Sequence, residues 1–355
     1  METVTRTVGR MSIDDRRAGS TERRPGRIGR GRRDGEAAGR TLWTRGRVLA
    51  SIAVLVSALM AFHGVVPNTV GNLGSLLETF LPWAGLAVPV LMAAASLRRS
   101  ALATVSLVLP AAVWAALFGE RIFPADRGTA HDLTVVQHNV DDENPDPGGT
   151  ARALARAGAD LIALEELTPE ALPVYEAVLA PDHPHHAVVG TVGLWSRHPL
   201  VDSRPVDIRP AGVGGDWNRG MRATARTPFG DMAVYVAHLP SVRLRLPDGF
   251  GSAWRDESAA ALGAAVAAEE LDGIVLLGDL NGTLDDRGLA PITSRMVPAQ
   301  EGFGFSWPAA WPVARIDHVM TRGAVPVSTW TLPATGSDHL PVAARIRRGA
   351  PEPGG

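Results

Sequence analysis

The sequence predicts an α/β domain preceded by transmembrane helices, and two features of its 355 residues indicate this arrangement. Between residues 48 and 118, three apolar stretches without a charged residue follow one another at short intervals. From about Leu133 onward, short runs rich in aliphatic residues alternate with turn clusters and a few alanine-rich stretches. Charge-free runs of about 20 residues are typical of membrane helices. The alternation of short strands with helices is typical of α/β folds.

The first 47 residues are rich in arginine, glycine and acidic residues and contain few large apolar side chains. Such a segment cannot bury a core, so we expect residues 1–47 to be a disordered tail. Acidic residues are interspersed among its arginines, which favours the positive flank of a membrane segment over a nucleic-acid-binding arm. We expect residues 349–355 to form a second flexible tail.

The apolar stretches are Val48–Val66, Leu81–Leu97 and Ala101–Phe118. Each has about the length that a helix needs to cross the hydrocarbon core, so we expect residues 48–120 to contain about three transmembrane helices in contact with the lipid bilayer. The first stretch could instead be a cleaved signal peptide, but two further apolar stretches follow it. Buried helices of a soluble domain are a second alternative, which the close spacing of the charge-free runs disfavours.

The arginines around these stretches predict an orientation. The N-terminal tail is rich in arginine, the loop Pro67–Phe80 has none, and Arg98 and Arg99 follow the second stretch. The positive-inside rule places the tail and the Arg98–Arg99 connection in the cytoplasm. Three spans would then leave the C-terminal part outside, as the extracytoplasmic domain of a multi-pass protein of the cell membrane.

Composition limits the chemistry that this chain can perform. A net charge of −2 gives no general attraction to nucleic acid. The sequence has no cysteine, which excludes disulfides, cysteine nucleophiles and thiolate metal sites. A metal ion would therefore be held by oxygen and imidazole ligands, which favours hard ions such as Mg²⁺, Mn²⁺ or Ca²⁺. No segment indicates an obligate protein partner.

Polar side chains end most of the predicted strands of the C-terminal part. Because strand ends meet at a common edge of a sheet, such side chains can converge on one pocket. Carboxylates combined with imidazoles would form a hard-metal site with an acid–base partner. Each residue alone is equally well explained as an ordinary strand-end or turn residue. The residues concerned are Asn139, Asp141, Glu165, Glu166, His238, Asp279, Asn281, Asp317, Asp338 and His339.

The motifs HNV, LEEL, VAHLP, GDLN, RIDHV and SDHLPV occur in this order between residues 133 and 347. In this order they resemble the endonuclease/exonuclease/phosphatase superfamily, which includes DNase I, abasic-site endonucleases, inositol polyphosphate 5-phosphatases and neutral sphingomyelinases. GDLN together with SDH carries most of the resemblance. It implies a DNase I-like four-layered α/β sandwich, with two packed β-sheets flanked by helices, in a catalytic domain at residues 130–348.

The resemblance also implies the roles of single residues, with Mg²⁺ or Mn²⁺ as the cofactor. Asp279 would orient or deprotonate the attacking water, and His339 would handle the proton or stabilise charge. Asp317 would orient His339, and His238 would contact the phosphate. Asn139 and Asn281 would help to hold the substrate. The expected metal ligands or near neighbours are Glu166, Asp338 and Asp141.

Several other polar residues lie outside this set. The segment Asn218–Ala223 contains Arg219 and Arg222, and we expect Arg222 to hold the phosphate. Glu165 stands where the family usually has glutamine, and neighbouring strand residues point to opposite faces, so it could face away from the site. The HPHH segment at 183–186 resembles a metal cluster, but its place in a loop before a strand disfavours that role. His318 is expected to face the other side of its strand.

The sequence therefore predicts a membrane-anchored phosphoesterase that uses a divalent metal and in-line attack of water on a phosphodiester or phosphomonoester. The substrate stays open among extracellular nucleic acid, a phospholipid head group, inositol phosphates and small phosphodiesters, because the fold does not choose among them. An alternative is a non-catalytic membrane-bound binding module with the same fold. A channel or transport role is disfavoured because charge-free helices offer no ion path.

Overall fold

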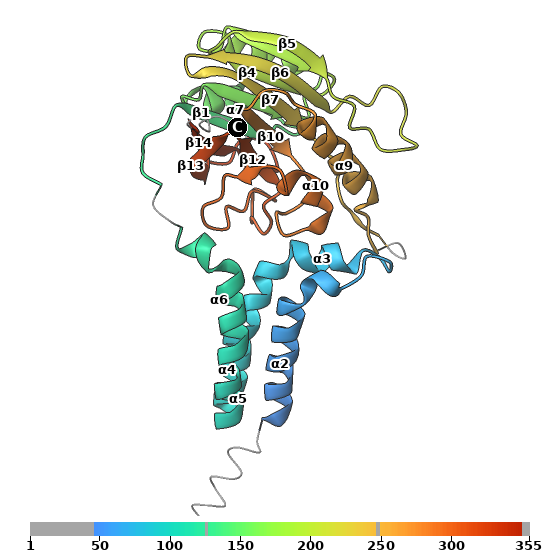
Figure 1. Cartoon of the computed structure of the whole chain (residues 1–355), viewed down its shortest axis with the longest axis vertical. Coiled ribbons are helices and arrows are strands. Elements are labelled where there is room, and N and C mark those ends of the chain that lie inside the picture. Colours follow the sequence, from blue (N-terminus) through green and yellow to red (C-terminus); the bar gives the residue numbers. More distant parts are fainter. Residues whose placement is uncertain (1–45, 125–126, 246–248, 350–355) are drawn as a thin grey trace, which may run out of the picture.

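The structure, a computed structural model, describes residues 46–124, 127–245 and 249–349 (Figure 1). A helical bundle extends from one side of an α/β sandwich. Nearly all of the predicted N-terminal tail, and residues 350–355 of the predicted C-terminal tail, lie outside the described residues.

Two six-stranded sheets form the centre of the sandwich, with the strand orders β13-β14-β1-β2-β4-β3 and β11-β12-β10-β7-β6-β5. The first sheet contains β1 (Leu133–Asn139), β2 (Leu161–Glu165), β3 (His185–Val189), β4 (Val192–Ser196), β13 (Ala324–Thr331) and β14 (Val342–Arg348). The second contains β5 (Leu200–Pro205), β6 (Gly220–Thr227), β7 (Gly230–Ala237), β10 (Ile274–Asp279), β11 (Val297–Pro298) and β12 (Asp317–Arg322). A small hairpin pairs β8 (Leu244–Arg245) with β9 (Gly249–Phe250).

Helices cover the outer face of each sheet. The first sheet packs against α7 (Pro147–Ala155) and α8 (Leu172–Leu179) through a buried apolar cluster. The second packs against α9 (Ala253–Ala267) and α10 (Ala290–Thr293), which follows η3 (Arg287–Leu289). A further apolar cluster lies between the two sheets. These four layers confirm the predicted α/β sandwich.

The apolar run of β10 shows why this arrangement suits the sequence. Ile274 and Leu276 belong to the cluster beneath α9, whereas Val275 and Leu277 belong to the cluster between the sheets. Successive side chains of a strand point to opposite faces, so a strand that is covered on both faces needs an unbroken apolar run. The same logic places the polar residue that follows such a run at the edge of the sandwich.

The pairing of the strands brings their polar ends to one edge. β1 and β2 are parallel, with Asn139 opposite Glu165. β7 and β10 are parallel as well, and β12 runs antiparallel to β10 with Asp317 opposite Asp279. The C-terminal ends of four strands and the first residue of β12 therefore supply the side chains of a shared site.

The bundle consists of α2 (Arg47–Ala61), α4 (Ala87–Leu97), α5 (Ala101–Ser106) and α6 (Val108–Ile122) (Figure 1). Between α2 and α4 lie η1 (His63–Val65), α3 (Leu73–Thr79) and η2 (Leu81–Leu86). Most large apolar side chains that are exposed belong to this region, including Leu55 at 66% and Val90 at 65%. An apolar surface of this extent is typical of a face that another phase or molecule covers.

One described helix, the continuous stretch Ala101–Ile122, is long and apolar enough to cross a membrane. The helix pair Leu73–Thr79 and Leu81–Leu97 is bent by 67° at its break, and it would be a second such helix if the pair forms a single span. The helix α2 is apolar but has 15 residues. By length and composition, one or two of the described helices could cross a membrane, whereas the sequence predicted about three.

Candidate active site

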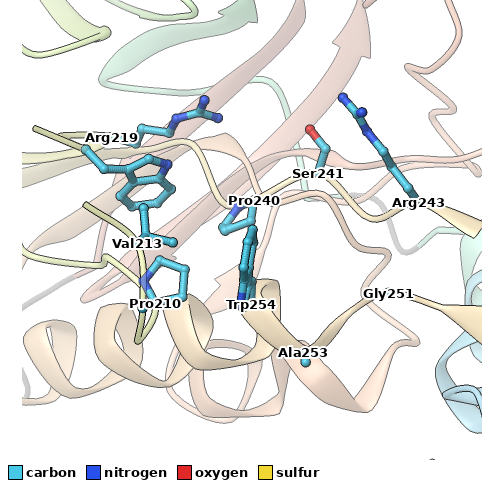
Figure 2. A pocket seen from close by; sticks show the side chains of 11 residues that line it. Pro210, Val213, Arg219, Pro240, Ser241, Arg243, Gly251, Ala253 and Trp254 are labelled. Atoms are coloured by element: carbon cyan, nitrogen blue, oxygen red, sulfur yellow. The ribbon is translucent and has the colours of Figure 1, made fainter. Parts of the chain in front are cut away.

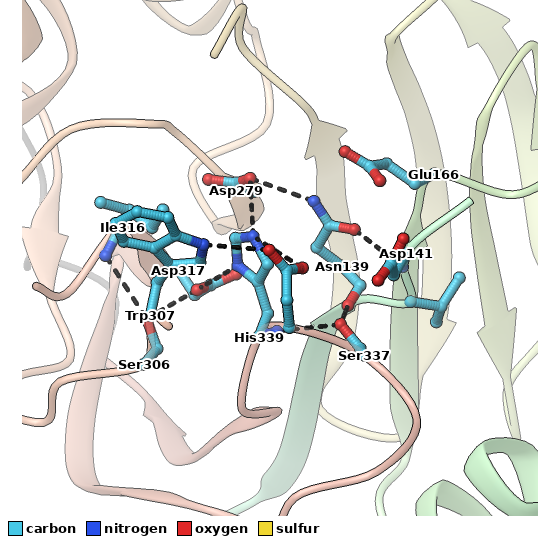
Figure 3. Close-up of polar contacts among 12 residues, drawn as sticks. Asn139, Asp141, Glu166, Asp279, Ser306, Trp307, Ile316, Asp317, Ser337 and His339 are labelled. Atoms are coloured by element: carbon cyan, nitrogen blue, oxygen red, sulfur yellow. Dashed lines mark hydrogen bonds and ion pairs between the residues drawn. The ribbon is translucent and has the colours of Figure 1, made fainter. Parts of the chain in front are cut away.

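Two adjoining pockets lie on the sandwich and share Arg219, Ser241 and Arg243. The first has a volume of about 590 Å³ and mainly apolar walls, which include Trp254 and Pro240, with both arginines at its upper edge in Figure 2. The second, of about 520 Å³, holds the polar strand ends (Figure 3). It is lined by Asp141, Asp142, Glu166, Asp279, Asn281, Asp338 and His339, among others.

His339 and Asp317 form a buried pair in the second pocket. Nδ1 of His339 lies 2.9 Å from Oδ2 of Asp317, which also accepts a 2.6 Å hydrogen bond from Ser306 Oγ. Gln137 Nε2 donates to Oδ1 of Asp317 over 2.9 Å. Burial opposes the charge of Asp317, but the cation of His339 and these donors lower the pKa of Asp317 to about 2.

The same contacts raise the pKa of His339. Burial alone would lower its pKa, yet the carboxylates of Asp317 and Asp279 raise the pKa of His339 to about 10. The imidazole is therefore cationic at neutral pH, with Nδ1–H directed at Asp317. Nε2 carries the second proton and lies 3.9 Å from Oδ2 of Asp279.

The SDHLPV turn sets the two adjacent side chains in different places. Ser337 Oγ donates to the carbonyl oxygen of Asn139 over 2.7 Å and accepts from the backbone N–H of His339 over 3.0 Å. This turn directs His339 inward. The side chain of Asp338 is 57% exposed, accepts a 3.1 Å hydrogen bond from Trp307 Nε1 and lies 3.7 Å from Nε2 of His339.

Asp279 is the buried carboxylate opposite His339. Its Oδ1 accepts from the backbone N–H of Asn281 over 2.9 Å, and its Oδ2 accepts from the side-chain amides of Asn139 and Asn281. Burial raises the pKa of Asp279 to about 7, while the cation of His339 acts in the opposite direction. The glycine of the GDLN motif has a steric cause, because a Cβ on Gly278 would collide with the carbonyl oxygen of Ala237.

A second acidic group lies nearer the surface of the same pocket. Asp141, Asp142 and Glu166 each offer a carboxylate oxygen, and these atoms lie within 4.8 Å of one another. Asp141 and Glu166 have positive φ angles of 65° and 59°, which are uncommon for residues with side chains and cost free energy. Three partly solvated carboxylates are the donor set that a hard divalent cation requires.

Asp142 was missed from the sequence, although the run Asp141–Glu143 directly after a strand end was visible. Asp279, Asp317 and His339 form another compact group of potential ligands. In this group Nδ1 of His339 lies 2.9 Å from Asp317 and Nε2 lies 3.9 Å from Asp279, so both ring nitrogens have a carboxylate nearby.

His238 places a buried N–H group beside two carboxylates that line the second pocket. Arg219 Nη1, which can only donate, lies 3.3 Å from Nδ1 of His238, so the proton of the neutral ring is on Nε2. Burial, followed by the charge of Arg219, keeps the pKa of His238 well below 6.5. Among the described residues, buried Nε2 has no hydrogen-bond partner; it lies 3.5 Å from Glu166 Oε1 and 3.7 Å from Asp279 Oδ2. A buried donor without an acceptor suits an incoming oxygen atom.

The structure does not bring Arg222 to the pocket. Its guanidinium is buried, and Nε and Nη2 bind the two carboxylate oxygens of Glu269 over 3.0 and 3.1 Å. Arg222 lies in β6, and Arg219 is the residue directly before this strand. Because an odd number of positions separates the two arginines, their side chains point to opposite faces of the sheet. Arg219 lines the pocket instead. The prediction that Arg222 holds the phosphate is therefore wrong, because its guanidinium is paired with Glu269 away from the pocket.

Glu165 does not face away from the site. Gln137 Nε2 donates to its Oε2 over 2.9 Å and also to Asp317, so one amide group links Glu165 to the His339–Asp317 pair. Burial and the nearby charge of Asp317 raise the pKa of Glu165 well above 4.5, which keeps the carboxyl group neutral.

The other histidines that the sequence made conspicuous lie elsewhere. Nε2 of His318 binds the carbonyl oxygen of Gly282 over 2.8 Å, and Nε2 of His183 binds that of Ala159 over 2.9 Å. His186 pairs with Glu176. None of these three lines the second pocket.

The Endonuclease/Exonuclease/phosphatase family matches residues 136–339, which is more than half of the chain. The chain belongs to the endonuclease/exonuclease/phosphatase family. The match extends from β1 to His339 and so contains each polar strand end described above. Membership of this family makes the protein a hydrolase of phosphate esters in the coarse sense.

Solved structures share the fold of this family member at low sequence identity. The beta toxin 275–280 from Staphylococcus aureus is 14% identical with a TM-score of 0.51, over 60% of this chain and 99% of that one. An endonuclease/exonuclease/phosphatase from Bacteroides vulgatus is 16% identical with a TM-score of 0.50, over 62% and 100%. Such similarity shows the fold alone. No curated protein sequence matches the chain.

Proposed function

We propose that this protein is a membrane-anchored phosphoesterase that uses a divalent metal to hydrolyse a phosphodiester or phosphomonoester by in-line attack of water. The observation that carries the proposal is the position of Asp279 between the His339–Asp317 pair and the unpartnered N–H of His238. An acid, a base and an oxygen-binding donor then face one volume. A purely structural polar cluster would satisfy its donors internally.

Asp141, Asp142 and Glu166 would hold Mg²⁺ or Mn²⁺. Their oxygens lie close together, and a chain without cysteine offers no thiolate alternative. When bound, the ion would supply positive charge that stabilises phosphate oxygens in the transition state. Asp338 was predicted as a ligand, but its carboxylate binds Trp307 and lies outside this group, so we assign it to the surroundings of His339.

The protein's own groups account for the proton transfers. Anionic Asp279 takes a proton from the attacking water, whose oxygen forms a bond to phosphorus as the ester P–O bond breaks. Cationic His339 gives its Nε2 proton to the leaving oxygen, so that one phosphate and one alcohol result. Asp317 is a positioning residue for His339. His238 Nε2–H donates to a non-bridging oxygen, and the amides of Asn139 and Asn281 hold Asp279 and the phosphate.

Membrane anchoring is supported by the form of the bundle. The start of α2 and the connection between α4 and α5 lie at the end of the bundle that is far from the sandwich (Figure 1). The helix α2 begins at Arg47, and the connection after α4 contains Arg98 and Arg99. The positive-inside rule would place that end in the cytoplasm and the catalytic part outside. A C-terminal alkaline phosphatase fusion should be active in cells and a C-terminal fluorescent-protein fusion dark. The reverse pattern would refute the orientation.

Hydrolysis of bis-p-nitrophenyl phosphate by the purified full chain in detergent tests the activity. We expect turnover with Mg²⁺ or Mn²⁺, its loss with EDTA, and its return when excess metal is added. An Asp279→Asn variant should bind Mn²⁺ and remain inactive. If the wild-type protein binds Mn²⁺ and phosphate but hydrolyses none of several phosphate esters, the chain is a binding module and the proposal is wrong.

A further inference from the structure

One wall of the catalytic pocket comes from the N-terminal helices. Thr79 and Phe80, at the end of α3, line the pocket together with Asp279 and His339. Phe80 is 40% exposed, so an apolar ring stands at the border of a pocket whose interior is charged. A bound substrate would therefore contact the end of the helical bundle.

An apolar groove begins two residues further along the same segment. It has a volume of about 490 Å³, lies between η2 and α6, and none of its lining residues carries a charge. The Trp83 ring stacks on that of Phe305 at 5.4 Å and donates its Nε1–H to the carbonyl oxygen of Val313 over 2.8 Å. The walls of the groove include Pro82, Trp83, Leu86, Trp114, Phe303 and Phe305.

Two chain segments contribute to both cavities. Phe80 lines the catalytic pocket and Pro82 lines the groove; on the other segment, Trp307 lines the pocket and Phe305 lines the groove. The charged pocket and the apolar groove are thus neighbours at the end of the bundle. A ligand that fits both must carry a phosphate ester at one end and an apolar chain at the other.

We propose that the substrate is a membrane phospholipid, whose phosphate ester occupies the catalytic pocket and whose acyl chain lies in the apolar groove. The inference rests on the proposed phosphoesterase activity and names its substrate class. The groove runs along helices that would themselves lie in the bilayer, so a chain can enter it without crossing water. Nucleic acid and inositol phosphates have no group for this groove.

The test compares a lipid with its own head group. The full chain is reconstituted in vesicles of phosphatidylcholine and phosphatidylglycerol, and hydrolysis is measured for these lipids, for the deacylated glycerophosphodiesters and for bis-p-nitrophenyl phosphate. We expect kcat/KM for the long-chain lipids to exceed that for the deacylated compounds by about tenfold or more, because each buried methylene contributes to binding. Ala111→Phe fills the groove, and Ala115→Phe places the same ring on the exposed face of α6 as a control.

Ala111→Phe should remove most of the preference for long-chain lipids while leaving bis-p-nitrophenyl phosphate hydrolysis unchanged, and Ala115→Phe should retain both. Equal rates for lipid and deacylated compounds, or a lipid preference that survives Ala111→Phe, would overturn the lipid assignment and leave the phosphoesterase proposal intact. Absence of turnover with every substrate, bis-p-nitrophenyl phosphate included, would contradict both.

A separate observation concerns the segment that follows the catalytic loop. Asp285 forms a two-pronged ion pair with Arg121 at the end of α6. Two residues later, Arg287 donates through Nη2 to Glu78 of α3 over 2.7 Å, and through Nη1 and Nη2 to two carbonyl oxygens of the η1 region. Glu78 is 2% exposed. Two separate helices at the sandwich-facing end of the helical region, α3 and α6, thus hold the same short segment.

Asp286, between Asp285 and Arg287, is connected through Arg255 to the Asp279–Asn281 loop. Asp286 accepts a 2.6 Å hydrogen bond from Nη2 of Arg255, whose side chain is fully buried in α9. Nη1 of Arg255 donates to the carbonyl oxygen of Asn281 over 3.1 Å. Asn281 has a positive φ of 47° and holds Asp279, so a displacement of this segment would reach the proposed base.

We infer that Glu78 is a positioning residue for the Asp279–Asn281 loop, which extends the proposed mechanism into the helical region. Glu78→Gln and Arg287→Gln should each lower kcat for bis-p-nitrophenyl phosphate, on the order of 10- to 100-fold, with little change in Mn²⁺ affinity. The exchanged pair Glu78→Arg with Arg287→Glu should recover part of kcat. Arg127→Ala removes a different link, to the carbonyl oxygen of Pro326, and should change neither value.

A fall in melting temperature with an unchanged kcat in both single variants would show that the pair is only structural. Equal losses of kcat in Arg127→Ala would show that any loosening of the helices suffices, which would also contradict the specific role of Glu78. An inactive wild-type protein would instead refute the proposed phosphoesterase activity on which this inference rests.

Discussion

The Nδ1 atom of His339 lies 2.9 Å from the Oδ2 atom of Asp317, and both side chains are buried. Their charges stabilise each other, which raises the pKa of His339 to about 10 and lowers that of Asp317 to about 2. The contribution of His339 to stability is therefore complete below its unfolded pKa of 6.5 and is lost as the pH rises through about 10. That of Asp317 is present above 3.8 and is lost as the pH falls through about 2.

Asp317→Asn should move the alkaline limb of the pH profile of kcat/KM from about 10 toward neutral pH. The substitution keeps a hydrogen-bonding group but removes the charge that stabilises the imidazolium. The profile is measured with bis-p-nitrophenyl phosphate at saturating Mn²⁺. Asp231→Asn, at an exposed position at the start of β7, is the control and should leave the limb in place. An unshifted limb in Asp317→Asn would contradict the assignment of the limb to His339.

Asp279→Asn and Glu166→Gln should separate base catalysis from metal binding. Asp279→Asn should lower kcat on the order of 10²–10⁴-fold, because general base catalysis is typically of that size, and should leave Mn²⁺ binding in place. Glu166→Gln removes a charge from the acidic group and should weaken Mn²⁺ binding. Calorimetric titration with Mn²⁺ and steady-state rates distinguish the two. Weakened Mn²⁺ binding in Asp279→Asn, together with unchanged Mn²⁺ binding in Glu166→Gln, would contradict the proposed roles.

His238→Ala should lower kcat by roughly 10²–10³-fold, as the loss of one oxyanion donor does in other hydrolases. Its Nε2–H has no hydrogen-bond acceptor among the described residues and lies 3.5 Å from Glu166 and 3.7 Å from Asp279. His183→Ala removes an equally buried imidazole far from the pocket and controls for the loss of packing. Comparable losses of kcat in the two variants would mean that His238 acts through folding.

Arg219→Met and Arg222→Met should have opposite effects. Arg222 is paired with Glu269 in the interior, and removal of one partner of a buried pair typically costs about 3–5 kcal/mol. Arg222→Met should therefore lower the free energy of unfolding and leave kcat/KM nearly unchanged. Arg219 lines both pockets, so Arg219→Met should lower kcat/KM with a smaller loss of stability. Denaturant unfolding and steady-state kinetics measure both effects, and a catalytic loss confined to Arg222→Met would restore the original assignment.

Glu165→Gln should stabilise the protein increasingly as the pH rises above the unfolded pKa of 4.5. The folded protein keeps Glu165 protonated, so wild-type stability declines above the unfolded pKa of 4.5 until the folded pKa is passed. Glutamine has the same shape and does not ionise. Melting temperatures of both proteins across this pH range test the sign. A difference that shrinks with increasing pH would mean that Glu165 is ionised in the folded protein.

The order of motifs resembles that of the endonuclease/exonuclease/phosphatase family, and this resemblance implied the sandwich. The strand-end pattern by itself predicted only that polar side chains meet at one edge. The pair Asp317–His339 and the loop Asp279–Asn281 follow from that order. The motifs do not indicate that Asp142 and Arg219 line the pocket. Their positions depend on the left-handed backbone at Asp141 and on which face of β6 a side chain occupies.

Contacts between the helices and the sandwich had no signal in the sequence. Glu78 and Arg287 are 209 residues apart, and nothing in either neighbourhood indicates its partner. The apolar stretches predicted helices, but their lengths depend on where each helix breaks. The chain bends by 67° between α3 and the apolar stretch Leu81–Leu97, and the pattern of hydrophobicity does not encode that bend.

The most direct test of the proposed chemistry is hydrolysis of bis-p-nitrophenyl phosphate by the full chain in ¹⁸O-labelled water with saturating Mn²⁺. The account predicts that wild-type protein incorporates ¹⁸O into the phosphate product and none into p-nitrophenol, because the water oxygen bonds to phosphorus. His339→Gln should give little product. Label in the p-nitrophenol, or turnover of His339→Gln at the wild-type rate, would contradict in-line attack of water at this site.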